Sequence, residues 1–161
     1  MTTVRIGNGY DVHRLEKGLR LVLCGVDIPH DRGCVAHSDG DVAIHALCDA
    51  LLGAASLGDI GRHFPDTDGK YENIASGILL ERVCGMLSEN GYAVGNVDIV
   101  IVAQRPKVAP YIEDMRRNLS ETMGIPVSSV SVKATTTERL GFTGREEGIA
   151  AYAVALIDNI R

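Results

Sequence analysis

The chain has 161 residues, of which 45% are hydrophobic and 23% charged, a balance typical of a globular protein. Its formal net charge of −5 argues against a nucleic-acid partner, because surfaces that bind nucleic acids are normally basic. There is no Trp and there are only two Phe residues, so the core is expected to be aliphatic. We expect a single domain over residues 1–161, because no repeat or linker interrupts the chain.

The N-terminal residues contain no long apolar run, and no stretch reaches the roughly 18 apolar residues needed to span a bilayer. The four cysteines form no Cys-x-x-Cys pair, so we do not expect a thiolate zinc site. These features favour a soluble cytoplasmic protein with reduced cysteines, no signal peptide and no membrane partner.

The first half of the chain predicts two strands, one strong helix and a polar loop. A strand over 4–10 contains a Gly-Asn-Gly turn and runs into Asp11-Val12-His13, and a second strand spans 19–27. After a polar segment, residues 41–57 predict a helix with an apolar stripe on one side. Residues 58–68 read as a charged loop.

The second half alternates helices and strands. The pattern predicts helices over 74–90 and 110–123, and strands over 94–104, 129–135 and 148–159. The strand over 94–104 is apolar at nearly every position, so we expect it to be buried on both faces. The order predicts an α/β (α+β) fold in which helices pack on one face of a mixed β-sheet.

Three residues suggest a metal site. Asp11 and His13 are two positions apart on a strand, so their side chains point to the same face. His45 lies in the most apolar helix, where an imidazole needs a partner or a metal. Each motif alone is more often structural: a strand-end Asp, or a hydrogen-bonded core histidine. Taken together, two imidazoles and one carboxylate suit a catalytic zinc ion with an open fourth position.

Three further segments carry polar groups. Lys133-Ala-Thr-Thr-Thr-Glu138 offers hydroxyls and amides for phosphate oxygens, although a polar strand end is the plainer interpretation. The loop from Asp59 to Asp68 either binds substrate or is simply solvated. Residues 103–107 follow a buried strand, where ligands often bind. Arg145 is either a phosphate ligand or an ion-pair partner of Glu147.

These segments together resemble a known family. GYDVH, AHSDGDVAIHAL, LGDIGRHFPDTD, GNVDIVIVAQRPK and KATTTERLGFTGREEG, in this order, are similar to the 2-C-methyl-D-erythritol 2,4-cyclodiphosphate synthases. The resemblance runs from residue 4 to the C-terminus and departs from the family at Asn8, where His is common. Because Asn8 is not among the implied ligands, we expect no loss of activity.

The resemblance implies a reaction, two metals and a homotrimer with active sites between subunits. The substrate would be 4-diphosphocytidyl-2-C-methyl-D-erythritol 2-phosphate, whose 2-phosphate attacks the diphosphate and expels CMP. It implies Zn²⁺ on Asp11, His13 and His45, and Mg²⁺ or Mn²⁺ on Glu138. It implies transition-state stabilisation by His37 and Thr136. The implied substrate-binding residues are Asp11, Val12, His13, His37, Ser38, Asp59, Ile60, Gly61, Phe64, Pro65, Asp66, Thr67, Asp68, Ala103, Gln104, Arg105, Pro106, Lys107, Val108, Ala109, Thr135, Thr136, Thr137, Glu138, Phe142 and Arg145.

Two other functional classes are compatible with parts of this pattern. A zinc-dependent phosphoester hydrolase would activate water on the same three ligands. A nucleotide-binding trimer without catalysis would need no metal ligands, so the complete ligand set argues against it.

Overall fold

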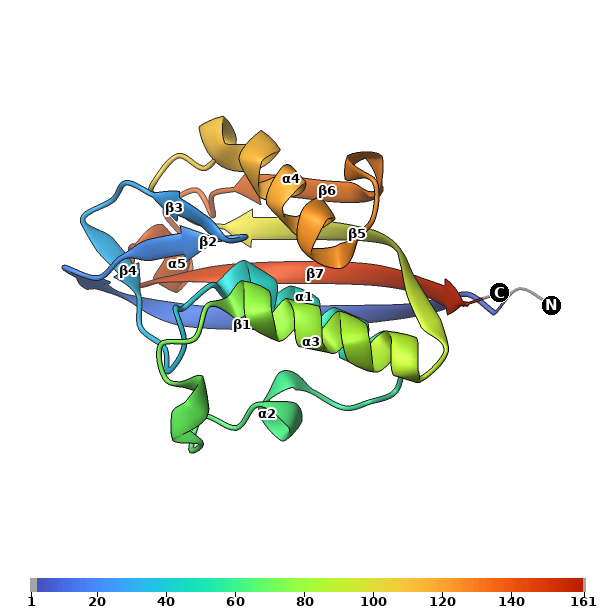
Figure 1. Cartoon of the computed structure of the whole chain (residues 1–161). Coiled ribbons are helices and arrows are strands. Elements are labelled where there is room, and N and C mark those ends of the chain that lie inside the picture. Colours follow the sequence, from blue (N-terminus) through green and yellow to red (C-terminus); the bar gives the residue numbers. More distant parts are fainter. Residues whose placement is uncertain (1–2, 161) are drawn as a thin grey trace.

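A mixed five-stranded sheet organises the computed structural model, which describes residues 3–160 (Figure 1). Its strands run in the order β4-β1-β7-β5-β6. Only β5 and β6 pair in parallel, and all other neighbours are antiparallel. The predicted α/β class with a mixed sheet is confirmed. The strands are β1 (Arg5–Lys17), β4 (Arg32–Cys34), β5 (Tyr92–Val102), β6 (Val130–Thr135) and β7 (Gly148–Asn159).

Three long helices cover one face of this sheet (Figure 1): α1 (Val42–Ala54), α3 (Ser76–Glu89) and α4 (Ile112–Met123). The short helices are α2 (Ile60–His63) and α5 (Gly141–Gly144), with 3₁₀ turns at Gly69–Tyr71, Ala109–Tyr111 and Val127–Ser129. Within residues 3–160, no helix combines the length and apolar character that crossing a membrane requires.

The helix α1 lies between the sheet and α3, and eleven of its thirteen residues are buried. The residues of the predicted apolar stripe are all buried, and burial extends further around the helix because α1 has neighbours on more than one side. Two glycines of β1 allow α1 to pack closely against this strand. A Cβ on Gly7 would lie 1.9 Å from the carbonyl oxygen of Ala50, and one on Gly9 1.9 Å from that of Ala46. These glycines lie within a continuous strand, so the predicted turn around Asn8 was also wrong.

The predicted strand over 19–27 is instead a small hairpin of β2 (Leu21–Leu23) and β3 (Val26–Ile28). The two residues between them have positive φ angles, 50° at Cys24 and 73° at Gly25, as tight hairpin turns require. The expected polar segments also contain structure, since β4 lies in the first of them and α2 in the loop over 58–68.

The opposite, outer face of the sheet carries none of the three long helices, although the short helix α5 lies against one end of it beside Gly148. Ile6, Tyr10, Tyr152 and Val154 point away from α1 and are 69%, 47%, 52% and 47% exposed. In β5, Val100 on the same face is only half-buried. The prediction that this strand is buried on both faces was therefore wrong for the single chain, because the outward-facing side chains of β5 are not fully covered.

Candidate metal and substrate site

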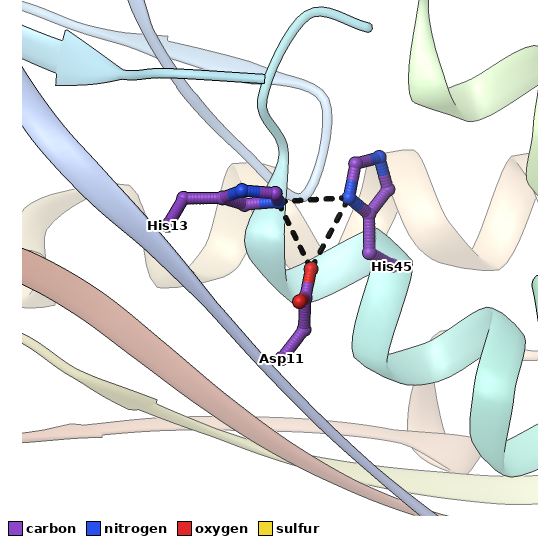
Figure 2. A group of neighbouring side chains, drawn as sticks. All are labelled: Asp11, His13 and His45. Atoms are coloured by element: carbon purple, nitrogen blue, oxygen red, sulfur yellow. Dashed lines mark hydrogen bonds and ion pairs between the residues drawn. The ribbon is translucent and has the colours of Figure 1, made fainter. Parts of the chain in front are cut away.

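Asp11, His13 and His45 converge on one point between the sheet and α1 (Figure 2). Asp11 and His13 lie on the inner face of β1, and the intervening Val12 points to the outer face. Asp11 Oδ2 is 2.9 Å from His13 Nε2 and 3.2 Å from His45 Nδ1. The two ring nitrogens are 3.0 Å apart. The three candidate ligands found from the sequence therefore form a compact triangle.

Asp41 sets the position of His45 by fixing where α1 begins. Its side chain is fully buried, and Oδ1 accepts hydrogen bonds from the backbone N–H groups of Ile44 and Cys24. Oδ2 accepts a hydrogen bond from the N–H of Gly25. One carboxylate thus caps the helix and fastens it to the β2–β3 hairpin. His45 follows one turn later, with its N–H bonded to the carbonyl of Asp41.

The donor set fits a tetrahedral cation. Ligands about 2.0 Å from a zinc ion at tetrahedral angles lie about 3.3 Å from one another, close to the three observed separations. Burial acts to raise the pKa of Asp11, but its close contacts and electrostatic interactions with the rings of His13 and His45 together outweigh this effect and hold the pKa well below its usual value. The carboxylate is therefore ionised at neutral pH, as a metal ligand must be.

The triad opens into a cavity of about 440 Å³ that brings together ten of the predicted site residues. These are Asp11, His13, His37, Ser38, His45, Ile60, Gly61, Phe64, Pro65 and Asp66. The structure adds Ala36, Tyr71, Ile74 and Leu79, which sequence reasoning missed. Apolar residues in a polar segment and in a helix carry no local signal of a binding role, and only tertiary packing brings them to this cavity.

Asp59 and Asp68, predicted in the loop, do not line this cavity. Instead, their side chains cap the short helical turns that surround it. The Asp59 side chain caps α2 through the N–H of Arg62, and Asp68 caps the following 3₁₀ turn through the N–H of Lys70. From α1, Asp49 accepts a hydrogen bond of 2.7 Å from the N–H of Ile60. The loop is thus tied to the helix that carries His45.

A second cavity of about 800 Å³ lies at the carboxyl ends of β5 and β6. The parallel register pairs Val102 with Thr135, so the segments that follow both strands meet at one edge. The lining includes the predicted residues Ala103, Gln104, Arg105, Pro106, Lys107, Val108, Ala109, Thr135 and Thr136. The peptide bond between Arg105 and Pro106 is cis. His30, Asp31 and Ala134 also line this cavity and were not predicted.

The chain turns sharply after Thr136. Glu138 and Arg139 both have positive φ angles, 53° and 63°, which cost side-chain-bearing residues free energy and concentrate at functional sites. The N–H of Glu138 bonds to Thr136 Oγ1, and that of Arg139 to Oε1 of Gln104. Thr137 instead bonds within the turn, to the carbonyl of Leu140.

Thr67 lines neither of these two cavities, and Val12, Phe142 and Arg145 lie elsewhere. Val12 and Phe142 line a third cavity of about 450 Å³ with Glu147, and His13 of the triad also contributes to its lining. Arg145 forms an ion pair of 2.9 Å with Glu147, which is one of the two roles considered for it. The first two cavities share no lining residue within residues 3–160, so one chain does not join the triad to the Thr135–Glu138 turn.

Comparison with known proteins gives a consistent result. The model of the YgbB family matches residues 4–158. A protein of Thioalkalivibrio sulfidiphilus named 2-C-methyl-D-erythritol 2,4-cyclodiphosphate synthase is 64% identical over 159 residues, covering 99% of each chain. The bifunctional IspDF of Campylobacter jejuni matches with a TM-score of 0.96 and 42% identity, over 99% of this chain and 43% of that one.

IspF of Plasmodium falciparum, solved as a CDP complex, matches with a TM-score of 0.86 and 34% identity, over 100% of this chain and 99% of that one. Sequence and structure therefore agree over almost the whole length, and the chain belongs to the YgbB family, which includes the 2-C-methyl-D-erythritol 2,4-cyclodiphosphate synthases.

Proposed function

We propose that this enzyme converts 4-diphosphocytidyl-2-C-methyl-D-erythritol 2-phosphate to 2-C-methyl-D-erythritol 2,4-cyclodiphosphate with release of CMP, in the non-mevalonate isoprenoid pathway. One observation carries the proposal. The Asp11–His13–His45 triad opens into a cavity in a chain whose full-length relative bears the name of this synthase.

The reaction is an intramolecular phosphoryl transfer. An oxygen of the 2-phosphate forms a bond to the β-phosphorus, while the bond from that phosphorus to the CMP oxygen breaks and its electron pair leaves with CMP. The nucleophile is already an anion and the leaving group a stabilised phosphate, so no strong general base or acid is required. The protein must align the reacting groups and offset the negative charge on the phosphoryl oxygens.

The proposed roles follow from where the residues lie. His37 and Ser38, in the first cavity, would hold the erythritol phosphate together with the loop from Asp59 to Asp68. In the second cavity, the backbone and hydroxyl groups of Ala103–Ala109 and Thr135–Glu138 would hold the cytidine and diphosphate. His37 and Thr136 would donate hydrogen bonds to the phosphoryl oxygens in the transition state.

Two cation sites belong to the proposal. Asp11, His13 and His45 would hold Zn²⁺, and Glu138 would supply the protein ligand for Mg²⁺ or Mn²⁺. When bound, the two ions would neutralise charge on the phosphates, which accounts for an anionic substrate on a chain of net charge −5.

The proposed assembly is a homotrimer with active sites at the subunit interfaces. Two observations support it: His37 and Thr136 line different cavities of one chain, and the face of the sheet away from the three long helices exposes apolar side chains. Association through such a face would bury the apolar surface and allow one subunit to complete the site of the next. The proposed location is the cytoplasm, which suits the four free cysteines.

Product analysis tests the reaction. The purified enzyme, with zinc and magnesium, is expected to release CMP and a cyclic diphosphate that takes up no oxygen from ¹⁸O-labelled water. A linear phosphate carrying the label would instead identify a zinc-dependent hydrolase. ³¹P NMR and mass spectrometry distinguish these products.

A further inference from the structure

The ring nitrogen of His45 that points away from the triad meets two hydroxyl groups. Nε2 lies 2.9 Å from Oγ of Ser76 and 3.0 Å from Oγ of Ser38. Ser76 is the first residue of α3 and is fully buried. Ser76 is not among the residues that line the cavity, so its hydroxyl contacts the His45 ring on the side away from the cavity.

The hydrogen-bond direction at Ser76 is set by Asp39. Oδ1 of Asp39 accepts a hydrogen bond from Oγ of Ser76, and Oδ2 accepts one of 3.0 Å from the N–H of Ser76. A hydroxyl has one proton, and here it is donated to the carboxylate. The Ser76 oxygen therefore accepts a hydrogen bond from His45, so Nε2 carries the ring proton and the Nδ1 lone pair faces Asp11 and His13.

Two further hydrogen bonds fix the position of Asp39. The N–H of Asp39 bonds to the carbonyl of Ile74 at 3.1 Å, which fastens the segment before α1 to the segment before α3. Oδ1 of Asp39 also accepts a hydrogen bond from the N–H of Asp41, the residue that caps α1. The carboxylate therefore has little freedom to turn away from Ser76.

We propose that Asp39 and Ser76 are positioning residues that fix the tautomer and ring orientation of His45 for metal binding. The inference rests on the proposed metal site but not on the reaction that the enzyme catalyses. A ligand histidine needs a neutral nitrogen aimed at the cation, and a hydrogen bond from its other nitrogen toward a carboxylate supplies this and raises its basicity. Loss of such a partner typically lowers metal affinity by about 10- to 100-fold.

Zinc affinity, measured by competition with a chromophoric chelator, tests the proposal in Ser76→Ala and Asp39→Asn. Both variants are expected to bind zinc about 10- to 100-fold more weakly than wild type. Ser120→Ala is the matched control, because Ser120 is also buried but donates to the carbonyl of Ile125 in a different part of the fold. Its zinc affinity is expected to be unchanged, and wild-type affinity in either test variant would overturn the proposal.

A second measurement needs no variant. ¹⁵N NMR of the zinc-loaded wild-type enzyme with labelled histidine is expected to show a protonated Nε2 and a metal-coordinated Nδ1 at His45. The opposite assignment overturns the proposal even if the variants fail to fold. A wild-type enzyme that binds no zinc would instead refute the proposed metal site itself, so the two failures are distinguishable.

Discussion

At the scale of single residues, side-chain direction decides what each group of the site does. Asp11 and His13 meet His45 because alternate residues of β1 face α1, while Val12 between them faces the opposite side of the sheet. Lys133 lies on β6 just before the threonines, but its ammonium group forms an ion pair with Asp98. The two side chains are 56% and 41% exposed. We therefore expect Lys133 to contribute less to the site than the threonines that follow it.

His45→Ala is expected to lose bound zinc and nearly all activity, since two ligands from one strand cannot hold the ion alone. Elemental analysis of the purified variant checks this. His63→Ala serves as the control, because the His63 ring contacts the carbonyl of Leu57 and lies outside the triad. Stoichiometric zinc in the His45 variant would show that the ligand assignment is wrong.

Thr136→Ala is expected to reduce kcat more than Lys133→Ala. Thr136 lines the second cavity and its hydroxyl accepts the N–H of Glu138, whereas the Lys133 ammonium is engaged with Asp98. Steady-state kinetics with the same substrate compares the two variants. Equal losses in kcat would place Lys133 in the active site.

At the scale of elements, the site depends on how closely α1 approaches β1 and on where α1 begins. Gly7 and Gly9 permit the close approach, and Asp41 fixes the first turn and joins it to the hairpin. These contacts hold the two elements that carry the candidate metal ligands at a set distance. Changes at these positions should therefore affect stability first and metal binding as a consequence.

Gly9→Ala is expected to destabilise the protein by about 3 kcal/mol, because the new methyl group would overlap the Ala46 carbonyl in a packed core. Gly85→Ala is the matched control: this exposed helical glycine has open space around it, and alanine should stabilise by about 0.5–1 kcal/mol. Urea unfolding measures both. The same sign of change in the two variants would contradict this account of the packing.

Asp41→Ala is expected to cost about 3 kcal/mol, through the lost helix cap and the unsatisfied backbone N–H groups of the hairpin. Asp27→Ala removes an exposed ion pair with Arg20 and should cost less than about 1 kcal/mol. Chemical denaturation compares the two aspartates. A small effect at Asp41 would mean that the carboxylate does not hold the helix to the hairpin.

At the scale of the whole molecule, the proposed site residues of one chain lie mainly in two separate cavities. The metal triad and the Thr135–Glu138 turn belong to cavities with no lining residue in common, and the sheet leaves an apolar face open. Both observations favour an assembly in which a neighbouring copy completes the site.

Subunit mixing tests this arrangement. His45→Ala and Glu138→Ala are each expected to be inactive, but their equimolar mixture should recover roughly a quarter of wild-type activity after random exchange in a trimer, because some interfaces pair two intact halves. His45→Ala mixed with Asp11→Ala should recover none, since both changes lie on the same half-site. No recovery in the first mixture, with exchange verified by mass spectrometry, would argue that each site lies within one subunit.

The sequence by itself determined the long elements, the family and the three residues of the candidate metal site. The strand over 148–159 was predicted with its observed limits, and α1 and α4 within a few residues, because continuous apolar patterns and Pro or Gly boundaries are local signals. The Asp-x-His spacing on a strand was sufficient to place two ligands on one face, and motif order was sufficient to name the family.

The tertiary structure decided which of these residues meet. The hairpin at Cys24 and Gly25 was not predicted, because the turn lies within a continuous apolar run. Gly7 and Gly9 were misinterpreted as a turn, because their close contact is with a helix distant in sequence. Tyr71, Ile74 and His30 reach the cavities only through packing. Ser76 contacts His45 and Asp39 contacts Ser76, although the three residues lie in separate segments, because hydrogen bonds depend on distance in space and not on separation along the chain.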